Sequence, residues 1–311
     1  MKWQKKGLIF CPDGHTEWSK THAQIPTVLV LPDRLRVFFS SRNQFGKSQT
    51  GFLDVDIENP SKILYLHPEP VFSFGKPGTF DDDGVMPGSL ILQDDRLFLY
   101  YTGWNQRVTT SYHLAIGLAS SCDHGLSFQR NYEGPVIERA LSEPYLVAAP
   151  CVLHEKDAWK MWYISGTKWE LIENKYEPVY VIKYAHSADG IHWQRPNITC
   201  IPQLHENEAF AAPCVLKIKD VYHMWYCYRG SIAYRNGGKG GYRIGYASSK
   251  DGIAWERKDE EVGIGLSENG WDSEMMCYPY IVKVDDKLIM FYNGNGFGKT
   301  GVGYAILNQL P

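Results

Sequence analysis

Hydrophobic and polar positions repeat along this chain at a nearly constant interval. Each repeat begins with a proline and an apolar run, passes through a short polar turn that contains Asp, and ends in a second run rich in aromatic residues. Short apolar runs bounded by turn residues are typical of β-strands, so each repeat predicts a hairpin. The hairpins begin at Pro26, Pro87, Pro150, Pro213 and Pro279, whose sequence numbers differ by 61, 63, 63 and 66.

A third apolar run follows the hairpin in most repeats, and a tight turn then leads to a fourth. The turn segments read SCDHGLSFQR, SADGIHWQR and SKDGIAWER. Asp-Gly or a near equivalent supplies the positive φ that such a reversal needs. Four antiparallel strands in each of five repeats predict an all-β fold, a five-bladed β-propeller that forms a single domain over residues 1–311.

The two ends of the chain are predicted to meet in one blade. The fifth repeat stops after its third strand, at YAILNQLP, while KWQKK from Lys2 matches HWQRP and AWERK in the fourth-strand position. We therefore expect the N-terminal strand to complete blade five, which closes the ring and hides two sheet edges. The aromatic residues of the central strands are expected to pack between the blades.

Composition narrows the class of protein. A chain of 311 residues that is 44% hydrophobic can bury a large core. With 32 basic and 35 acidic residues, it has no net positive charge to attract nucleic acid. The seven cysteines form no CxxC pair and are expected to be reduced, mostly buried thiols. No apolar run is long enough for a membrane span or a signal-peptide core, so a cytoplasmic location without membrane contact is predicted.

Carboxylates occupy similar places in the repeats. In a four-stranded blade, the connection before the first strand and the loop after the second emerge at the same end of the ring, around its axis. Every entering connection contains an acid, and five residues before the proline stand Asp82, Glu208 and Glu274, with Thr21 and Tyr145 in the other two repeats. Separated carboxylates together with Arg, Asn and Trp are the groups that bind and cleave sugars.

These positions give the candidate residues. Glu208 is the predicted general acid, Asp82 or Asp83 the group that orients the sugar or activates water, and Glu274 a second candidate base. Three adjacent acids, Asp81 to Asp83, are expected to raise the pKa of at least one of them. The candidate sugar-binding residues are Glu17, His22, Arg42, Trp104, Asn105, Glu143, Lys168, Arg229, Asp272 and Asn295.

The repeats resemble those of the five-bladed propeller glycosidases, the superfamily of glycoside hydrolase families 43, 62, 32, 68 and 130. The resemblance rests on PxVL...MWY.SG and IKYAxSxDGIxW, and it covers essentially the whole chain. It implies that one acid from each of three blades acts as base or nucleophile, as stabiliser of the charged sugar, and as general acid. Family 43 places an Asp directly before the first-blade proline, where this chain has Ile25, and the family 32 signatures NDPNG and RDP are missing.

Metal binding is the weaker interpretation of two polar clusters. His15, Glu17 and His22 have a spacing that could ligate a metal, but hydroxyl binding is the preferred role for Glu17 and His22. The Asp triplet leaves a calcium site open as an alternative, although calcium needs six to eight oxygen ligands. No metal and no cofactor are therefore predicted.

Three functions follow as hypotheses. The first is a glycoside hydrolase, inverting if its two carboxylates stand about 6.5–9.5 Å apart. The second is a phosphorylase or glycosyltransferase that uses phosphate or a nucleotide sugar. The third is a propeller that binds sugar without catalysis. The anion site of the second hypothesis would draw on Arg42, Arg107, Arg229, Arg243 and Lys168.

Overall fold

The regular secondary structure of the chain is almost entirely β-strand, as predicted. The computed structural model describes residues 1–308 apart from 157, 231 and 236–239. The helices with described bounds are short: the α-helix α1 (Asn295–Gly298) and the 3-10 helix η2 (Asp259–Glu261). No helix of the described residues is long and apolar enough to cross a membrane.

The strands fall into antiparallel groups in chain order. The first group has the order β2 (Thr21–Val30), β3 (Arg34–Arg42), β4 (Ser48–Asp56) and β5 (Ile63–Leu66). The second has the order β6 (Gly84–Gln93), β7 (Arg96–Gln106), β8 (Tyr112–Ser121) and β9 (Gln129–Arg130). A single parallel pairing, of Ser48 in β4 with Gly84 in β6, links these two groups.

The third group departs from the four-strand prediction. It contains β10 (Val147–Glu155), β11 (Ala158–Ile172) and β12 (Lys175–Ser187), and the expected fourth strand is reduced to isolated bridges at Gln194 and Thr199. Pro196 lies between these bridges and has no N–H to donate, which works against a continuous ladder. The fourth group is regular, with β13 (Ala209–Ile218), β14 (Val221–Arg229), β15 (Arg243–Ser249) and β16 (Glu256–Arg257).

The fifth group joins the two ends of the chain. Its order is β17 (Cys277–Val284), β18 (Lys287–Asn293), β19 (Val302–Leu307) and then β1 (Gln4–Phe10). β1 pairs antiparallel with β19 in a register that sets Gln4 against Ile306 and Phe10 against Val302. The predicted pairing of the N-terminal strand with the last repeat is thus observed.

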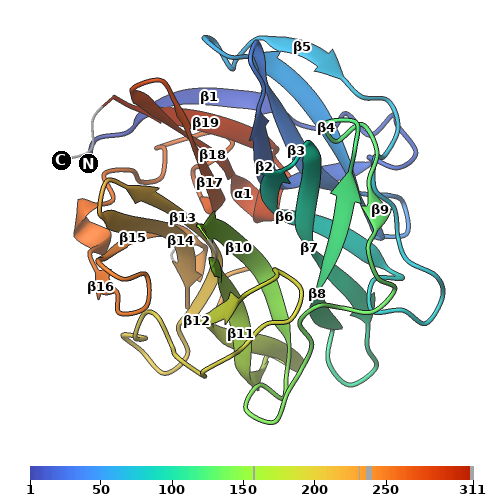
Figure 1. The fold of residues 1–311 in the computed structure, drawn as a ribbon, viewed down its shortest axis with the longest axis vertical. Helices are drawn as coiled ribbons and strands as arrows, with labels where there is room; N and C mark the ends of the chain where they lie inside the picture. The colour runs from blue at the N-terminus through green and yellow to red at the C-terminus, as the bar shows by residue number, and fades with distance from the viewer. Residues whose placement is uncertain (157, 231, 236–239, 309–311) are drawn as a thin grey trace.

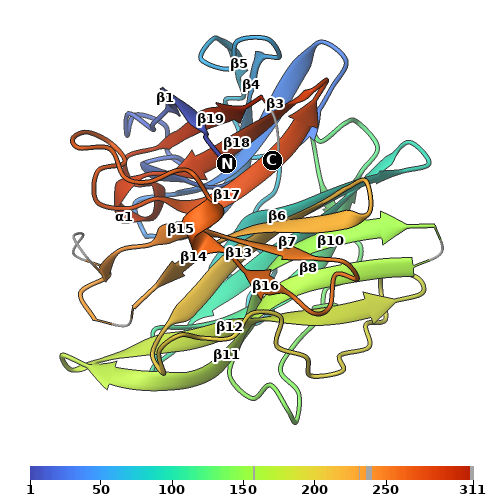
Figure 2. The ribbon, with the colours of Figure 1, turned by 90° about the vertical axis from the view of Figure 1, so that its left-hand side faces the viewer.

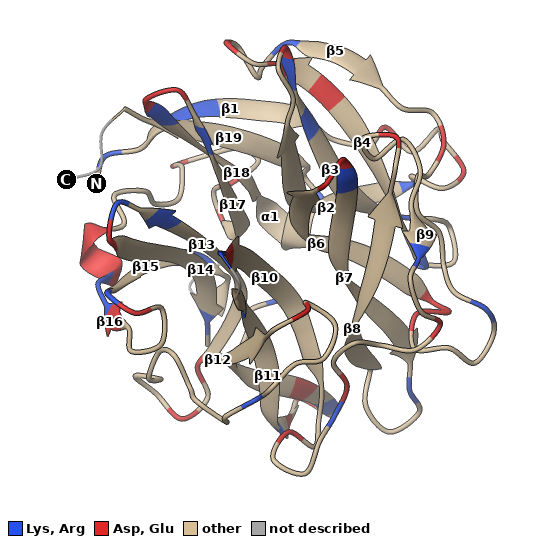
Figure 3. Cartoon of the chain, viewed as in Figure 1, with Lys and Arg blue, Asp and Glu red and all other residues tan. Residues whose placement is uncertain are grey.

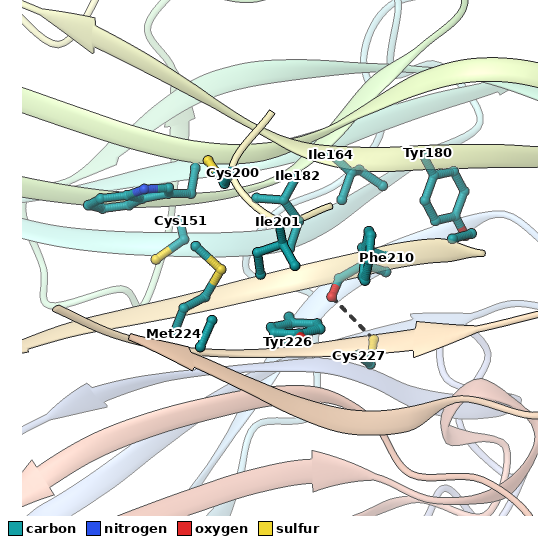
Figure 4. Packing of buried hydrophobic residues seen from close by; sticks show 14 of the residues in the cluster. Cys151, Ile164, Tyr180, Ile182, Cys200, Ile201, Phe210, Met224, Tyr226 and Cys227 are labelled. Carbon is teal, nitrogen blue, oxygen red and sulfur yellow. Dashed lines mark hydrogen bonds between the residues drawn. The ribbon is translucent and has the colours of Figure 1, made fainter. Parts of the chain in front are cut away.

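The five groups surround a common axis (Figure 1). The first strands of neighbouring groups contact each other, and these contacts run from β2 through β6, β10, β13 and β17 back to β2. Hydrophobic clusters fill the spaces between neighbouring groups, including the space between the first and the last. Figure 4 shows one of them, in which Ile182 of the third group faces Met224 and Tyr226 of the fourth.

The Asp-Gly turns form as the sequence predicts. Gly190 and Gly252 have φ of 74° and 77°, and the preceding Ser Oγ accepts each glycine N–H. Each of these turns also contacts the preceding group, because Tyr100 donates to the Gly190 carbonyl and Trp162 to the Gly252 carbonyl, both at 2.8 Å. A side chain at either glycine would meet that ring at 3.0 Å or less. Glycine is therefore required at both positions, because the backbone has a positive φ and because there is no space for a side chain.

Candidate functional site

A cavity lies where the innermost strands of the five groups converge. Its volume is about 320 Å³, within the range of small-molecule sites. Residues from all five groups line it, together with Phe297 of α1. Figure 2 shows α1 and the tip of the long β11–β12 hairpin at the same end of the molecule, and both elements contribute to this axial pocket.

A repeated irregularity in the innermost strands points residues at this pocket. Each of these strands has a register shift around its proline, as in a β-bulge. In four of them the residue before the proline has positive φ: Ile25, Ala149, Ala212 and Tyr278. These four residues and Met86, which precedes Pro87, line the pocket. The pre-proline position, at which family 43 has an Asp in its first blade, is therefore apolar or aromatic in every group.

Aromatic side chains form much of the remaining wall. Trp104 lines one side and donates from Nε1 to Ser48 Oγ at 2.7 Å. Tyr180 and Tyr242 also line the pocket, with their hydroxyls 2.5 Å apart. The buried Arg229 guanidinium donates to the Tyr180 hydroxyl at 3.2 Å and stacks 3.5 Å from the centre of the Tyr234 ring. Aromatic faces and hydroxyls in one pocket suit the apolar faces and hydroxyl groups of a sugar ring.

The charged side chains of the pocket wall are all basic. Arg42, Lys175 and Arg235 line it, whereas no Asp or Glu belongs to the wall among the described residues. Figure 3 agrees with this arrangement, since the innermost strands are mainly free of charged residues and the acids lie further out. Glu177 stands just behind the wall and binds Arg235 through two hydrogen bonds of 2.6 and 2.7 Å.

His22 is an electrically neutral neighbour of this cationic group. Its burial, and then the charges of Arg42 and Lys299, lower the pKa of the imidazole to about 3. The ring nitrogen Nδ1 lies 2.9 Å from Thr21 Oγ1. Among the described residues, no group of three or more His, Cys, Asp or Glu is arranged to hold a metal ion.

The three consecutive acids turn to different partners outside the pocket. Asp81 is fully buried and accepts hydrogen bonds from Tyr101 and Arg130. Asp82 accepts the N–H of Gly78 at 2.8 Å. Burial alone would raise the pKa of Asp83, but the Lys47 ammonium and a backbone N–H hold that pKa below its usual value. The lowered pKa keeps Asp83 ionised, so the rise expected for at least one of the three acids does not fall on Asp83.

Glu208 and Glu274 also lie outside the pocket wall. Glu208 is 5% exposed, and both of its carboxylate oxygens accept hydrogen bonds from the Arg257 guanidinium at 2.8 and 2.9 Å. The Glu274 residue is exposed, and its backbone N–H donates to Asn295 Oδ1. The structure does not bring Asp82, Glu208 and Glu274 to one point in the pocket, and their catalytic roles stay predictions.

The acids that recur before the innermost strands share a structural role. In four groups, a buried acid pairs with a cation on the outer side of its own group, and in three of them also with a tyrosine of the second strand. The four ion pairs are Asp81–Arg130, Glu143–Arg195, Glu208–Arg257 and Asp272–Lys5. Each pair ties the connection into the innermost strand to the outermost segment of the same blade-like unit.

Two of the predicted sugar-binding residues, Arg42 and Trp104, line the pocket, and His22 lies next to Arg42. Glu143 and Asp272 belong to the ion pairs, and Arg229 contacts tyrosines of the wall. The remaining predictions have partners elsewhere: Glu17 with Lys20, Asn105 with Thr79, Lys168 with Glu170 and Glu206, and Asn295 with Gly270.

Sequence reasoning missed Tyr112, Lys175 and Arg235. A signal for the last two was present, because the segments between the second and third strands of repeats three and four are longer than those of the other repeats. In the third repeat the sequence predicts a loop around Lys168. The extra length instead extends β11 and β12 into a long hairpin, which turns at Glu173 and Asn174, both with positive φ.

Comparison with solved structures assigns the fold. The structure of BT0996 in an RGII complex is 19% identical, with a TM-score of 0.75 and coverage of 99% of this chain and 92% of that one. A thermostable family-43 glycoside hydrolase is 16% identical, with a TM-score of 0.65 and coverage of 96% and 92%. A GH32 beta-fructofuranosidase of Bombyx mori, BmSUC1, has 15% identity, a TM-score of 0.62 and coverage of 92% and 61%.

Sequence comparison finds closer relatives. The uncharacterized proteins Rv1502 and MT1551 of Mycobacterium tuberculosis are each 37% identical over 311 residues, which is 99% of this chain and all of the relative. No protein-family model matches the sequence. The chain belongs to the family of these two mycobacterial proteins, and it has the fold of the propeller glycosidase superfamily.

Proposed function

We propose that this protein is a carbohydrate-active enzyme of the glycosidase type, built as a five-bladed propeller, and that its sugar ligand binds in the axial pocket. The pocket carries the proposal, because an aromatic and polar cavity of sugar size lies where five innermost strands converge. The continuous contacts between those strands, and the pairing of β1 with β19, support five blades in a closed ring.

Hydrolysis of a glycosidic bond requires carboxylates, and the pocket wall contains none among the described residues. Glycosidases place two carboxylates on either side of the scissile bond. The predicted acids are instead held in ion pairs or lie on the rim, and Glu208 is bound by Arg257 at both oxygens. Hydrolysis with inversion through Glu208, with Asp82, Asp83 or Glu274 as base, remains our proposal for the enzymatic reaction.

Sugar binding without catalysis is the second candidate. The specific observation in its favour is that all described charged residues in the pocket wall are basic. A wall with hydroxyls, aromatic rings and guanidinium groups can bind a sugar. Among the described residues, it contains no carboxyl group that could act as a general acid. The two candidates make opposite predictions for turnover while sharing the same ligand site.

Ligand binding is tested first by thermal shift against a panel of monosaccharides and oligosaccharides. A ligand at a hundred times its Kd stabilises the folded state by about 2.7 kcal/mol. We expect Trp104→Ala to abolish the stabilisation, because Trp104 lines the pocket. Tyr132→Ala, at a residue that is 45% exposed and outside the wall, is the matched control and should retain it.

Turnover is then measured by chromatography of oligosaccharides incubated with the protein. If the hydrolase candidate is right, Glu208→Gln lowers product formation by orders of magnitude and leaves sugar binding in place. If no sugar is released by the wild type although sugars bind, the non-catalytic candidate is right. A wild-type protein stabilised by no carbohydrate would refute both.

A further inference from the structure

The axial pocket has more basic than acidic groups among the residues that the structure describes. Arg42, Arg235 and Lys175 line it, and the single described acid that pairs with any of them is Glu177. Three cations against one adjoining carboxylate leave two positive charges. Taking charge out of water is costly unless an opposite charge is nearby, so this excess favours a bound anion.

Arg42 is the residue with the clearest need for a partner. Its Nε donates to the side-chain oxygen of Gln24 at 3.0 Å, and no described carboxylate lies within ion-pair distance. Burial, and then repulsion by Arg235, lower the pKa of Arg42, although a guanidinium remains charged at any physiological pH. The two arginines therefore act on each other across one cavity.

Arg235, which lines the same pocket, is held in a fixed orientation. Nε and Nη2 donate to the two oxygens of Glu177, while Nη1 makes no hydrogen bond to a described residue. Tyr234 also donates to Glu177, so the carboxylate serves as an anchor for the wall. An arginine positioned in this way presents a preorganised donor to a ligand, which reduces the entropy that binding costs.

We infer that the axial pocket binds an acidic sugar, whose carboxylate or phosphate group is held between Arg42 and Arg235. This inference rests on the proposed sugar site and names the ligand class for it. Arginine forks match the oxygens of both groups, and Lys175 at the exposed mouth adds a third positive charge. Trp104 and Tyr112, also in the wall, offer aromatic surface to the sugar ring.

Calorimetric titration with matched ligands tests the inference. Glucose, galactose and mannose are each compared with the corresponding uronic acid and the corresponding 6-phosphate, and inorganic phosphate is titrated separately. We expect at least one acidic form to bind at least roughly tenfold more tightly than its neutral sugar. The uronic acid and phosphate arms identify which anionic group the pocket prefers.

Substitution of single arginines tests which residue causes the preference for an acidic sugar. Arg42→Gln should weaken binding of the acidic sugar far more than binding of the neutral sugar, and so remove most of the preference. Arg107→Gln, at an exposed arginine outside the pocket wall, is the control and should preserve the preference. The affinity of the acidic sugar should also fall as the salt concentration rises, because salt screens the attraction.

The outcomes separate the inference from the proposed function. Equal affinity for neutral and acidic sugars, or a preference that survives Arg42→Gln, overturns the inference while the sugar site stands. Binding of inorganic phosphate through Arg42 with no sugar affinity contradicts the acidic-sugar ligand and the proposed function, although the anion site itself would be real. Binding of none of these ligands overturns the inference, whereas the proposed function is overturned only if the wider carbohydrate panel also fails to bind.

Discussion

The three consecutive acids, Asp81 to Asp83, lie in three different environments. Asp81, Asp82 and Asp83 are adjacent in sequence, yet one is buried with Arg130, the next caps a turn, and the third pairs with Lys47. Because successive side chains point in different directions, neighbours in the chain need not share an environment. The sequence identified a place rich in carboxylates, and tertiary contacts decided what each one does.

His22 is expected to make the folded state sensitive to acid. Its pKa is about 3 when folded, below the ordinary value for histidine, so between these two values the unfolded state binds the proton and the folded state does not. Stability should therefore fall as the pH decreases from about 6.5 toward 3, by less than about 1.4 kcal/mol per pH unit because solvent partly screens the ring.

Thermal unfolding between pH 7 and 5 measures this contribution. His22→Asn keeps a residue that tolerates the observed φ of 68°, and it should show a smaller loss of melting temperature over this interval than the wild type. Equal losses in the two proteins would show that His22 does not carry the effect.

At the scale of the element, the repeated acids stabilise the individual sheets. The sequence revealed that the acids recur, and it also contained their partners, since FQR, WQR, WER and WQK place Arg130, Arg195, Arg257 and Lys5 at equivalent positions. The acid and its cation are far apart in the sequence and become neighbours when the outermost segment folds against its sheet. The recurrence of the acids in the sequence is explained equally well by a catalytic role. The ion pairs seen in the structure identify a structural role instead.

Loss of one cation from such a pair should be strongly destabilising. Arg130→Met leaves the fully buried Asp81 carboxylate without its charged partner, which we expect to cost about 3–5 kcal/mol. Lys62→Met removes an exposed ion pair with Asp56 and is the control, with an expected change below about 1 kcal/mol. Denaturant unfolding measures both, and similar small changes would contradict a structural role for the buried pair.

At the scale of the whole molecule, the N-terminal strand holds the first and last parts of the chain together. Beyond its pairing with β19, it brings Trp3 into a cluster with the fourth and fifth groups, where the Trp3 and Trp225 rings meet edge to face at 6.0 Å. Hydrophobic clusters between all neighbouring groups distribute the core around the common axis. Damage at the N-terminus should therefore affect the stability of distant groups of strands.

Trp3→Ala tests this coupling. Removing a large buried aromatic side chain is expected to cost about 3–5 kcal/mol, and the loss should appear in the unfolding of the entire ring. Phe45→Ala, at a side chain that is 72% exposed, should change the stability by less than about 0.5 kcal/mol. Unfolding monitored by fluorescence and by circular dichroism checks both, and a small effect of Trp3→Ala would argue against closure through this strand.

The repeat, the hairpins, the Asp-Gly turns and the pairing of the chain ends can be predicted from the amino-acid sequence, because they depend on local hydrophobic periodicity and on residues with special φ. The sequence also indicates the end of the molecule that holds the pocket, with Arg42 and Trp104 in its wall. Which charged groups reach the axis depends instead on tertiary contacts. Bulges before the prolines point Ile25 and Tyr278 inward, while buried ion pairs hold the acids away, and both depend on contacts between residues that are distant in sequence.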